Sequence, residues 1–212
     1  PRDTELSIVG RVNKATGKRE GGIVGLNAPQ TRVWTQIRDA LETPEGVRSL
    51  LVKDRKTGKW KPALESINTA TFNRLVKAAS KGEALSKADA AMSMRQISND
   101  MLKERGEMIA RTETIGSLNA GRVEGMQQLI DAGNVTADQV LKIWDSGGPD
   151  GRTRDTHLAL EGQAKRMDEP FVSPSGARMM HPGDSSLGAP ASETVACRCA
   201  VRFSLDFMRG LK

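Results

Sequence analysis

Four side chains in the C-terminal third of the chain are of types that bind metal ions. They are His157, His181, Cys197 and Cys199, and zinc accepts two thiolates and two imidazoles in tetrahedral geometry. The spacing differs from that of a zinc finger, in which the two histidines are close together, because 24 residues separate the histidines here. The sequence therefore offers a weak candidate zinc site and does not establish one.

The same residues could take part in acid–base or nucleophilic chemistry. His157 could pair with Asp155 or Glu193 as a general acid or base, and Cys197 could be a nucleophile beside a histidine. Nothing in the spacing orders these groups, and a Cys-Arg-Cys triplet is more typical of a strand with alternating faces. Phosphate-binding, dinucleotide-binding, HExxH and GxSxG motifs are absent from the sequence. We therefore expect no enzyme, and a zinc-dependent enzyme is the weaker alternative.

Charged side chains of this region could instead hold its loops together. Arginine forms paired hydrogen bonds with carboxylates, and a segment with few apolar residues needs such polar contacts to become compact. We favour this structural interpretation and expect no cofactor. The expected donors and acceptors are Arg111, Glu113, Asp150, Arg152, Arg154, Asp184 and Glu193.

The composition limits both the core and the compartment. Apolar residues make up 37% of the 212 residues, with three Trp, four Phe and no Tyr, so a modest core of aliphatic side chains is expected. A disulfide between two cysteines one residue apart would be strained, which favours a reducing compartment. The chain has no apolar run of about 18 residues and no visible signal peptide, so no membrane partner is expected.

A basic cluster lies in the first half of the chain. Residues 1–110 carry 20 Lys and Arg against 13 Asp and Glu, whereas residues 111–212 carry 12 against 13. Five cations surround a Thr57-Gly58 turn and Trp60. This cluster could contact DNA phosphates without reading sequence, or it could be a solvated hairpin tip. The five are Lys53, Arg55, Lys56, Lys59 and Lys61.

The hydrophobic periodicity predicts how the chain is organised. Residues 1–30 are expected to form an extended arm or hairpin with turns near Gly10, Gly17 and Gly21. Apolar residues at helical spacing predict a helix over 31–42, with Ile37 and Leu41 on one face, and a helix over 86–132, where Met101, Met108 and Ile115 belong to one apolar stripe. Further helices are expected over 45–52 and 69–80. The helix over 86–132 could break near Gly106 or Gly116, since a glycine inside a helix costs about 1 kcal/mol relative to alanine.

After residue 133 the pattern changes to short apolar runs separated by Gly, Pro and Ser. Strands are expected over 140–144 and 199–203, within a loop-rich module that spans 134–206 and is followed by a tail at 207–212. The predicted fold is therefore α+β, with a helical region over 31–133 and then a small module with short strands.

Several motifs in a fixed order resemble those of the phage Mu F-like head morphogenesis proteins, also called minor head or minor capsid proteins. They are ARTET at 110–114, Trp144, DGRTRDTH at 150–157, LEG at 160–162, EPF at 169–171, PSGAR at 174–178, PGD at 182–184, GAPASE at 188–193 and CRC at 197–199. The GGIVGL segment at 21–26 is similar to a segment of the longer members.

The resemblance implies a minor structural protein of a tailed-phage head, located in the virion and, during assembly, in the bacterial cytoplasm. It implies association with the portal protein at the portal vertex, contact with the major capsid protein, and a role in head morphogenesis and in packaging or ejection of double-stranded DNA. A DNA-binding protein of the head interior is the alternative. Many members have a CPxC pair where this chain has Arg154 and His157, and this departure weakens the prediction of a metal here.

Overall fold

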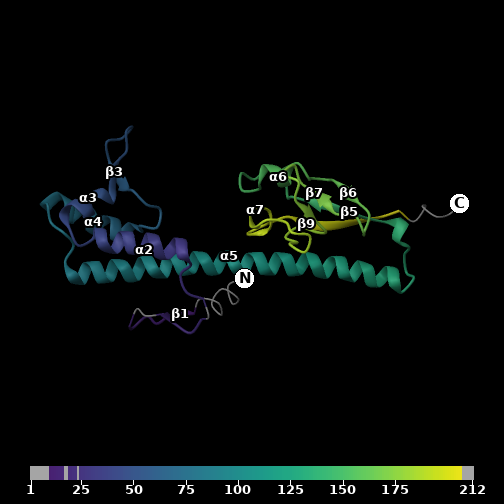
Figure 1. Cartoon of the computed structure of the whole chain (residues 1–212), viewed down its shortest axis with the longest axis horizontal. Coiled ribbons are helices and arrows are strands. Elements are labelled where there is room, and N and C mark those ends of the chain that lie inside the picture. The colour runs from purple at the N-terminus through teal and green to yellow at the C-terminus, as the bar shows by residue number, and fades with distance from the viewer. Residues whose placement is uncertain (1–9, 17–18, 23, 207–212) are drawn as a thin grey trace. The chain divides into compact units, whose positions relative to one another are not determined.

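The computed structural model describes residues 10–16, 19–22 and 24–206. The expected turn at Gly17, the first nine residues of the arm and the tail at 207–212 lie outside the described residues. Within them the architecture is α+β, as predicted, with long helices first and short antiparallel strands later (Figure 1). No described helix is both long enough and apolar enough to cross a membrane.

The chain divides into two compact units, which we describe separately. The N-terminal unit extends to Glu107 and the C-terminal unit begins at Met108. This division lies inside helix α5 (Lys87–Asp131), whereas the sequence placed the change of organisation near residue 133. Composition changes where the helix ends, but the helix itself contributes residues to the cores of both units.

Three helices pack against the first part of α5 in the N-terminal unit. Helix α2 (Ala28–Ala40) begins three residues earlier than predicted, because Asn27 and Gln30 form a capping box. Helix α3 (Pro44–Ser49) begins at a proline, one residue before the predicted start at 45, and Thr43 caps it. Helix α4 (Thr69–Lys81) ends at Gly82, which adopts the left-handed conformation.

These helices bury one aliphatic core. Ile37 and Leu41 lie on the buried face of α2, as their spacing predicted, and Met94, Ile97 and Met101 provide the face of α5. Val47, Leu50, Leu51, Ile67 and Leu75 complete this core.

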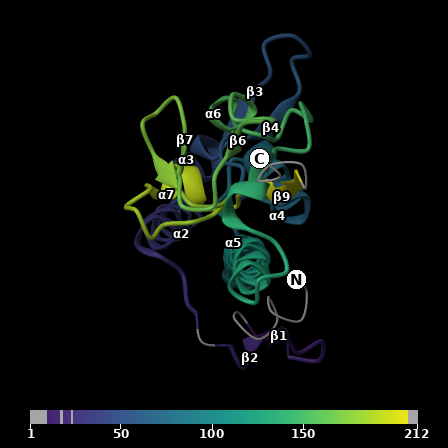
Figure 2. The same ribbon diagram turned by 90° about the vertical axis from the view of Figure 1, so that its right-hand side faces the viewer.

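Two hairpins belong to the same unit. Strands β1 (Arg11–Val12) and β2 (Arg19–Glu20) pair antiparallel, and the Arg19 guanidinium donates to Asn99 of α5. Figures 1 and 2 show this hairpin on a different side of α5 from α2. Strands β3 (Leu51–Lys53) and β4 (Trp60–Pro62) form the second hairpin, which agrees with the hairpin tip that was one interpretation of the basic cluster; the first strand replaces the predicted end of a helix at 51–52.

Helix α5 is continuous over 45 residues and does not break at either glycine. Gly106 is buried, and Gly116 lies so close to Gly183 that a methyl group added at Gly183 would stand 3.4 Å from the Gly116 Cα. The low helix propensity of glycine is therefore offset here by close packing of the helix backbone. Met108, which the periodicity placed in the core stripe, is 43% exposed.

A three-stranded antiparallel sheet organises the C-terminal unit. Strand β5 (Val140–Asp145) lies between β6 (Ala164–Lys165) and β9 (Ala200–Leu205), and Trp144 pairs with Val201. Alternate residues of β5 are buried. Val135, Val140 and Met167 pack with the Val123, Met126 and Ile130 side chains of α5, so the helix covers one side of this core.

Short elements carry the rest of this unit. They are the 3-10 helix η1 (Ala137–Gln139), helices α6 (Asp155–Leu158) and α7 (Ala191–Thr194), and the paired strands β7 (Phe171–Val172) and β8 (Arg178–Met179). A second small core contains Trp144, Leu160, Phe171, Met179 and both cysteines. The cysteines thus lie in the interior, next to aromatic side chains.

Candidate functional site

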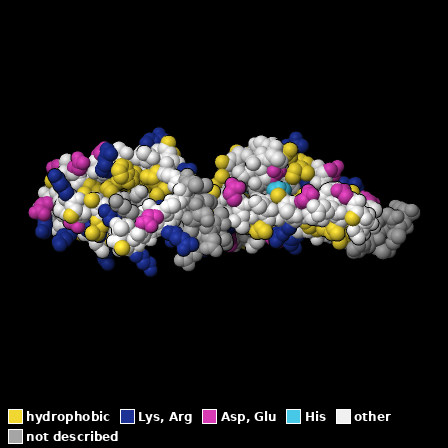
Figure 3. Space-filling view, turned by 90° about the horizontal axis from the view of Figure 1, so that it is seen from below, with side chains coloured by type: hydrophobic (Ala, Val, Ile, Leu, Met, Phe, Trp, Pro, Cys, Tyr) yellow, Lys and Arg dark blue, Asp and Glu magenta, His cyan; other side chains and the backbone are white. Residues whose placement is uncertain are grey.

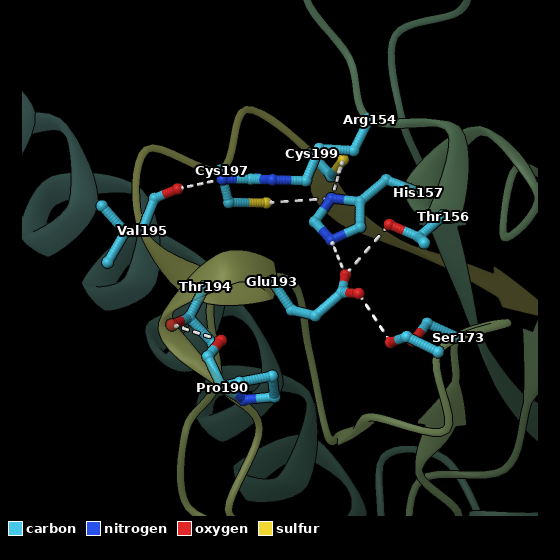
Figure 4. Close-up of polar contacts among 11 residues, drawn as sticks. Arg154, Thr156, His157, Ser173, Pro190, Glu193, Thr194, Val195, Cys197 and Cys199 are labelled. Carbon is cyan, nitrogen blue, oxygen red and sulfur yellow. Dashed lines mark hydrogen bonds and ion pairs between the residues drawn. The ribbon is translucent and has the colours of Figure 1, made fainter.

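His157 lies at the centre of a buried polar cluster in the C-terminal unit. Its side chain is 1% exposed. The Nε2 atom is 2.9 Å from Glu193 Oε2, and the Nδ1 atom is 3.4 Å from Cys199 Sγ and 3.7 Å from Cys197 Sγ (Figure 4). The imidazole therefore lies between a carboxylate on one side and two sulfur atoms on the other.

Three short segments bring these groups together. His157 lies on the single turn of α6, directly after a loop in which Asp150 Oδ1 accepts the Arg152 and Thr153 amides. Glu193 lies on α7. Both cysteines immediately precede β9, whose pairing with β5 sets their position relative to Trp144. Tertiary packing, rather than sequence spacing, creates the cluster.

Glu193 is held in its charged form although it is buried. Burial acts to raise the pKa of its carboxyl group, but hydrogen bonds from Ser175 and Thr156, together with the neighbouring His157, lower it below the usual value. The Ser175 hydroxyl donates to Oε1 at 2.6 Å and the Thr156 hydroxyl donates to Oε2 at 3.1 Å. Both carboxylate oxygens thus have partners, as a buried charge requires.

The two cysteine side chains lie close enough to change each other's pKa. A hydrogen bond between them lowers the pKa of Cys197 to about 5 and raises the pKa of Cys199; burial opposes the charge on both, and His157 also favours the Cys197 thiolate. Both side chains are 1% exposed. The pair therefore presents two adjacent sulfur atoms, one of them readily charged, to the Nδ1 atom of the imidazole.

Trp144 closes one side of the cluster. Its ring meets the His157 ring edge to face, with centroids 5.2 Å apart, and meets Phe171 in the same way at 5.3 Å. The buried indole N–H has no hydrogen-bond partner among the described residues. The aromatic side chains thus pack against the cluster on this side.

The turn before the cysteines is hydrogen-bonded to Thr112 of α5, a residue of the ARTET motif. Ala196 has a φ of +54°, which is strained for a residue with a Cβ atom. Its amide donates to the Thr112 hydroxyl at 2.8 Å, and that hydroxyl donates to the Met108 carbonyl at 2.8 Å. In addition, the Arg154 guanidinium donates to the Val195 carbonyl at 2.5 Å. These contacts hold the turn in an unfavourable backbone conformation.

The sequence analysis missed Asn119, a second attachment of this segment to α5. The side chain is 1% exposed; its amide donates to the carbonyls of Pro182 and Cys199, and its oxygen accepts the Val201 amide, each at 3.0 Å. An asparagine at an apolar position of the helix stripe was the available signal.

Lys142 is another buried ionisable group that the sequence analysis missed. It is fully buried, and Nζ donates to the carbonyls of Met167 and Met180 at 3.1 and 2.9 Å. Burial lowers its pKa to about 8, although Asp168, Asp184 and Glu169 act in the opposite direction. Its place between Val140 and Trp144, on the same face of a strand with a period of two, could have indicated burial.

The structure brings three of the four metal-binding candidates together. The ligand atoms of His157, Cys197 and Cys199 all lie within 4.8 Å of one another. His181 lies apart, where it lines a cavity of about 420 Å³ with Thr112, Gly116 and Asp184. The predicted set of four is therefore a set of three, and Glu193 contacts the histidine on its far side.

The charged residues that were expected to hold the loops together form no pairs with one another among the described residues. Arg154 binds a carbonyl, and Asp184 accepts the Met180 and Ser186 amides. Asp150 lies 3.7 Å from Arg198 rather than from a predicted partner. Glu193 contacts His157 instead. The remaining three are exposed and form no ion pair among the described residues. These three are Arg111, Glu113 and Arg152.

The five cations of the basic cluster are all exposed on the β3–β4 hairpin, which extends away from the helices of its own unit (Figure 1). Asp54 accepts the Lys56 and Thr57 amides and shapes the tip, and Lys53 lies over the Trp60 ring at 5.2 Å. The structure thus presents an exposed, positively charged hairpin tip.

A family model described as Phage Mu protein F like protein matches residues 70–202. The match covers more than half of the chain. The chain belongs to this family. The Mu F-like region includes all of α5 and the buried cluster, whereas the basic hairpin lies before it. The family is one of phage head morphogenesis proteins and not an enzyme class. No curated protein and no solved structure matches the chain.

Proposed function

We propose that this Mu F-like chain is a minor structural protein of a tailed-phage head that acts at the portal vertex. The family match over residues 70–202 carries this proposal. The proposed partners are the portal protein and the major capsid protein, and the proposed roles are head assembly and the packaging or ejection of DNA.

The geometry of the buried cluster supports a structural role over a catalytic one. A nucleophile must reach its substrate, but Cys197, Cys199 and His157 are each 1% exposed. The cavity of about 420 Å³ in this unit is lined by His181 and Asp184 and not by these three side chains. The cluster connects segments of the interior that are distant in sequence, because its members lie on α6, on α7 and before β9.

Mass spectrometry of purified heads tests this proposal. The chain should be present in a few copies per head, far below the major capsid protein, and it should be absent from heads assembled without portal protein. Unchanged incorporation into portal-less heads would contradict portal association. Absence from complete heads would contradict a virion role altogether.

The exposed hairpin supports DNA binding as a second candidate function. Five cations on one hairpin can neutralise phosphates. In a plot of the logarithm of the binding constant against the logarithm of the salt concentration, each phosphate contact contributes about −0.9 to the slope. We expect duplex DNA to bind regardless of sequence, with a salt dependence that flattens when the five cations are replaced by glutamine.

A matched variant separates the hairpin from net charge. On the face shown in Figure 3, Lys and Arg side chains are also spread around the rest of this unit, so an equal charge can be removed elsewhere. The control replaces Arg32, Lys77, Lys81, Lys87 and Lys103, all exposed and outside the hairpin. Equal loss of binding in both variants would show only a general charge effect, and absence of binding in the unmodified chain would end this candidate function.

A further inference from the structure

The side chains of His157, Cys197 and Cys199 converge on one point in the C-terminal unit. His157 Nδ1 lies 3.4 Å from one cysteine sulfur and 3.7 Å from the other. A tetrahedral zinc ion, with Zn–N of about 2.0–2.1 Å and Zn–S of about 2.3 Å, places a nitrogen and a sulfur ligand about 3.6 Å apart. The observed separations lie on either side of that value, and the three ligand atoms all lie within 4.8 Å of one another, so one ion can reach all three.

The histidine is also held in the state that a metal needs. Because the Glu193 carboxylate can only accept, the proton of the 2.9 Å contact lies on Nε2; in the neutral imidazole the Nδ1 lone pair then faces the sulfur atoms. A carboxylate on the outer nitrogen is the usual second partner of a metal-bound histidine, because it orients the ring and increases its basicity. Glu193 is in turn held by Ser175 and Thr156.

The arrangement fits a metal better than it fits a nucleophile. A cysteine nucleophile needs one sulfur near the imidazole and access for a substrate, whereas here two buried sulfur atoms converge on one nitrogen. The strained turn at Ala196, whose amide donates to Thr112, directly precedes Cys197. Buried thiolates are costly without a positive partner, and a divalent cation would provide one.

We propose that His157, Cys197 and Cys199 bind one zinc ion, with Glu193 as the positioning residue behind the histidine. Zinc replaces the thiol protons and takes its nitrogen ligand from Nδ1, and one coordination position remains for a water molecule or hydroxide. The ion joins α6 to the start of β9 and stabilises a unit that has a small apolar core. His181 has no part in this site.

The experiment uses the full chain, purified with a reductant and without chelator, then loaded with Zn²⁺ or with Co²⁺ as a spectroscopic probe. We expect one equivalent of zinc by elemental analysis. Cobalt should give the intense visible bands of a tetrahedral site and a near-ultraviolet thiolate-to-cobalt charge-transfer band. Folding is checked independently by circular dichroism.

Four variants locate the ion. Cys197→Ser and Cys199→Ser should each remove or strongly weaken the charge-transfer band, and His157→Gln should weaken binding. Glu193→Gln should retain the band but bind 10–100-fold more weakly, as found for second partners of metal ligands. His181→Gln is the matched control and should bind as the unmodified chain does.

If a cysteine variant does not fold, zinc and cobalt binding by the unmodified chain still tests the proposal. Folded protein that binds less than a tenth of an equivalent of zinc, or that binds cobalt without a thiolate band, would overturn the proposal. Loss of the metal in His181→Gln, or an unchanged thiolate band in both serine variants, would overturn it as well. Neither result depends on whether the chain is found in phage heads.

Discussion

The side-chain amide of Asn119 donates to the carbonyl oxygen of Cys199 at 3.0 Å. This bond joins the middle of α5 to the residue that precedes β9. Because the same side chain also binds Pro182 and Val201, one buried asparagine sets the position of the segment that carries both cysteines. The helix is thus the platform on which the cluster is built, although it contributes none of the cluster's reactive atoms.

Replacement of Asn119 by alanine should therefore destabilise the C-terminal unit. Two carbonyls and one amide would lose their partner in the interior, and each unsatisfied buried group costs about 1–3 kcal/mol. We expect a loss of about 3 kcal/mol in the free energy of unfolding, measured by urea denaturation. Asn134→Ala, at an exposed position, is the matched control and should change stability by less than about 0.5 kcal/mol. Equal effects of the two substitutions would refute the role given to Asn119.

Thr112 should act through its hydroxyl group and not through its size. Thr112→Val keeps the shape but leaves the Ala196 amide without its acceptor, which should cost about 1–2 kcal/mol. Thr112→Ser restores the hydroxyl and should recover most of that loss. If serine were as destabilising as valine in the same denaturation experiment, packing of the methyl group would be the cause instead.

Lys142 should make stability depend on alkaline pH. Its pKa is about 8 in the folded chain and about 10.5 in the unfolded chain, so the unfolded chain binds more protons between these values. Stability contributed through this group therefore rises with pH across that window. Between pH 7.5 and 10 the unmodified chain should gain about 2 kcal/mol relative to Lys142→Met.

Chemical denaturation at a series of pH values measures this difference. Lys59→Met removes an exposed lysine of the hairpin, so its stability should follow that of the unmodified chain at every pH. A constant difference between Lys142→Met and the unmodified chain from pH 7.5 to 10 would show that the buried ammonium has an ordinary pKa.

Two glycines of the C-terminal unit should respond oppositely to alanine. Gly121 lies within α5 with no atom within 4 Å of an added methyl group, so Gly121→Ala should stabilise by about 0.5–1 kcal/mol. Gly183 has a φ of +83° and packs against Gly116, so Gly183→Ala should destabilise by about 1–2 kcal/mol. Thermal unfolding followed by circular dichroism distinguishes them. A gain in Gly183→Ala would show that the loop can move away from the helix.

Local patterns identified most elements of the fold. The spacing of Ile37 and Leu41 predicted the buried face of α2, and the apolar run at residues 140–144 predicted β5, because these signals depend only on neighbouring residues. The sequence indicated a hairpin tip around Thr57-Gly58 but assigned Leu51 and Val52 to a helix, since strands of three residues have little periodicity. Met108 has the right spacing for the core and is nevertheless exposed, because periodicity indicates a face of a helix and not what covers it.

The sequence by itself determined the α+β class, the order of motifs that marks the Mu F-like family, and the residue types available for chemistry. Tertiary structure decided which of them meet. It placed Glu193 behind His157, brought Cys197 and Cys199 to the opposite nitrogen and left His181 apart, because these residues lie on separate loops whose distances no spacing encodes. The physical reason is that helix and strand periodicities are local, whereas a buried cluster depends on backbone contacts such as those of Asn119 and Thr112 between distant segments.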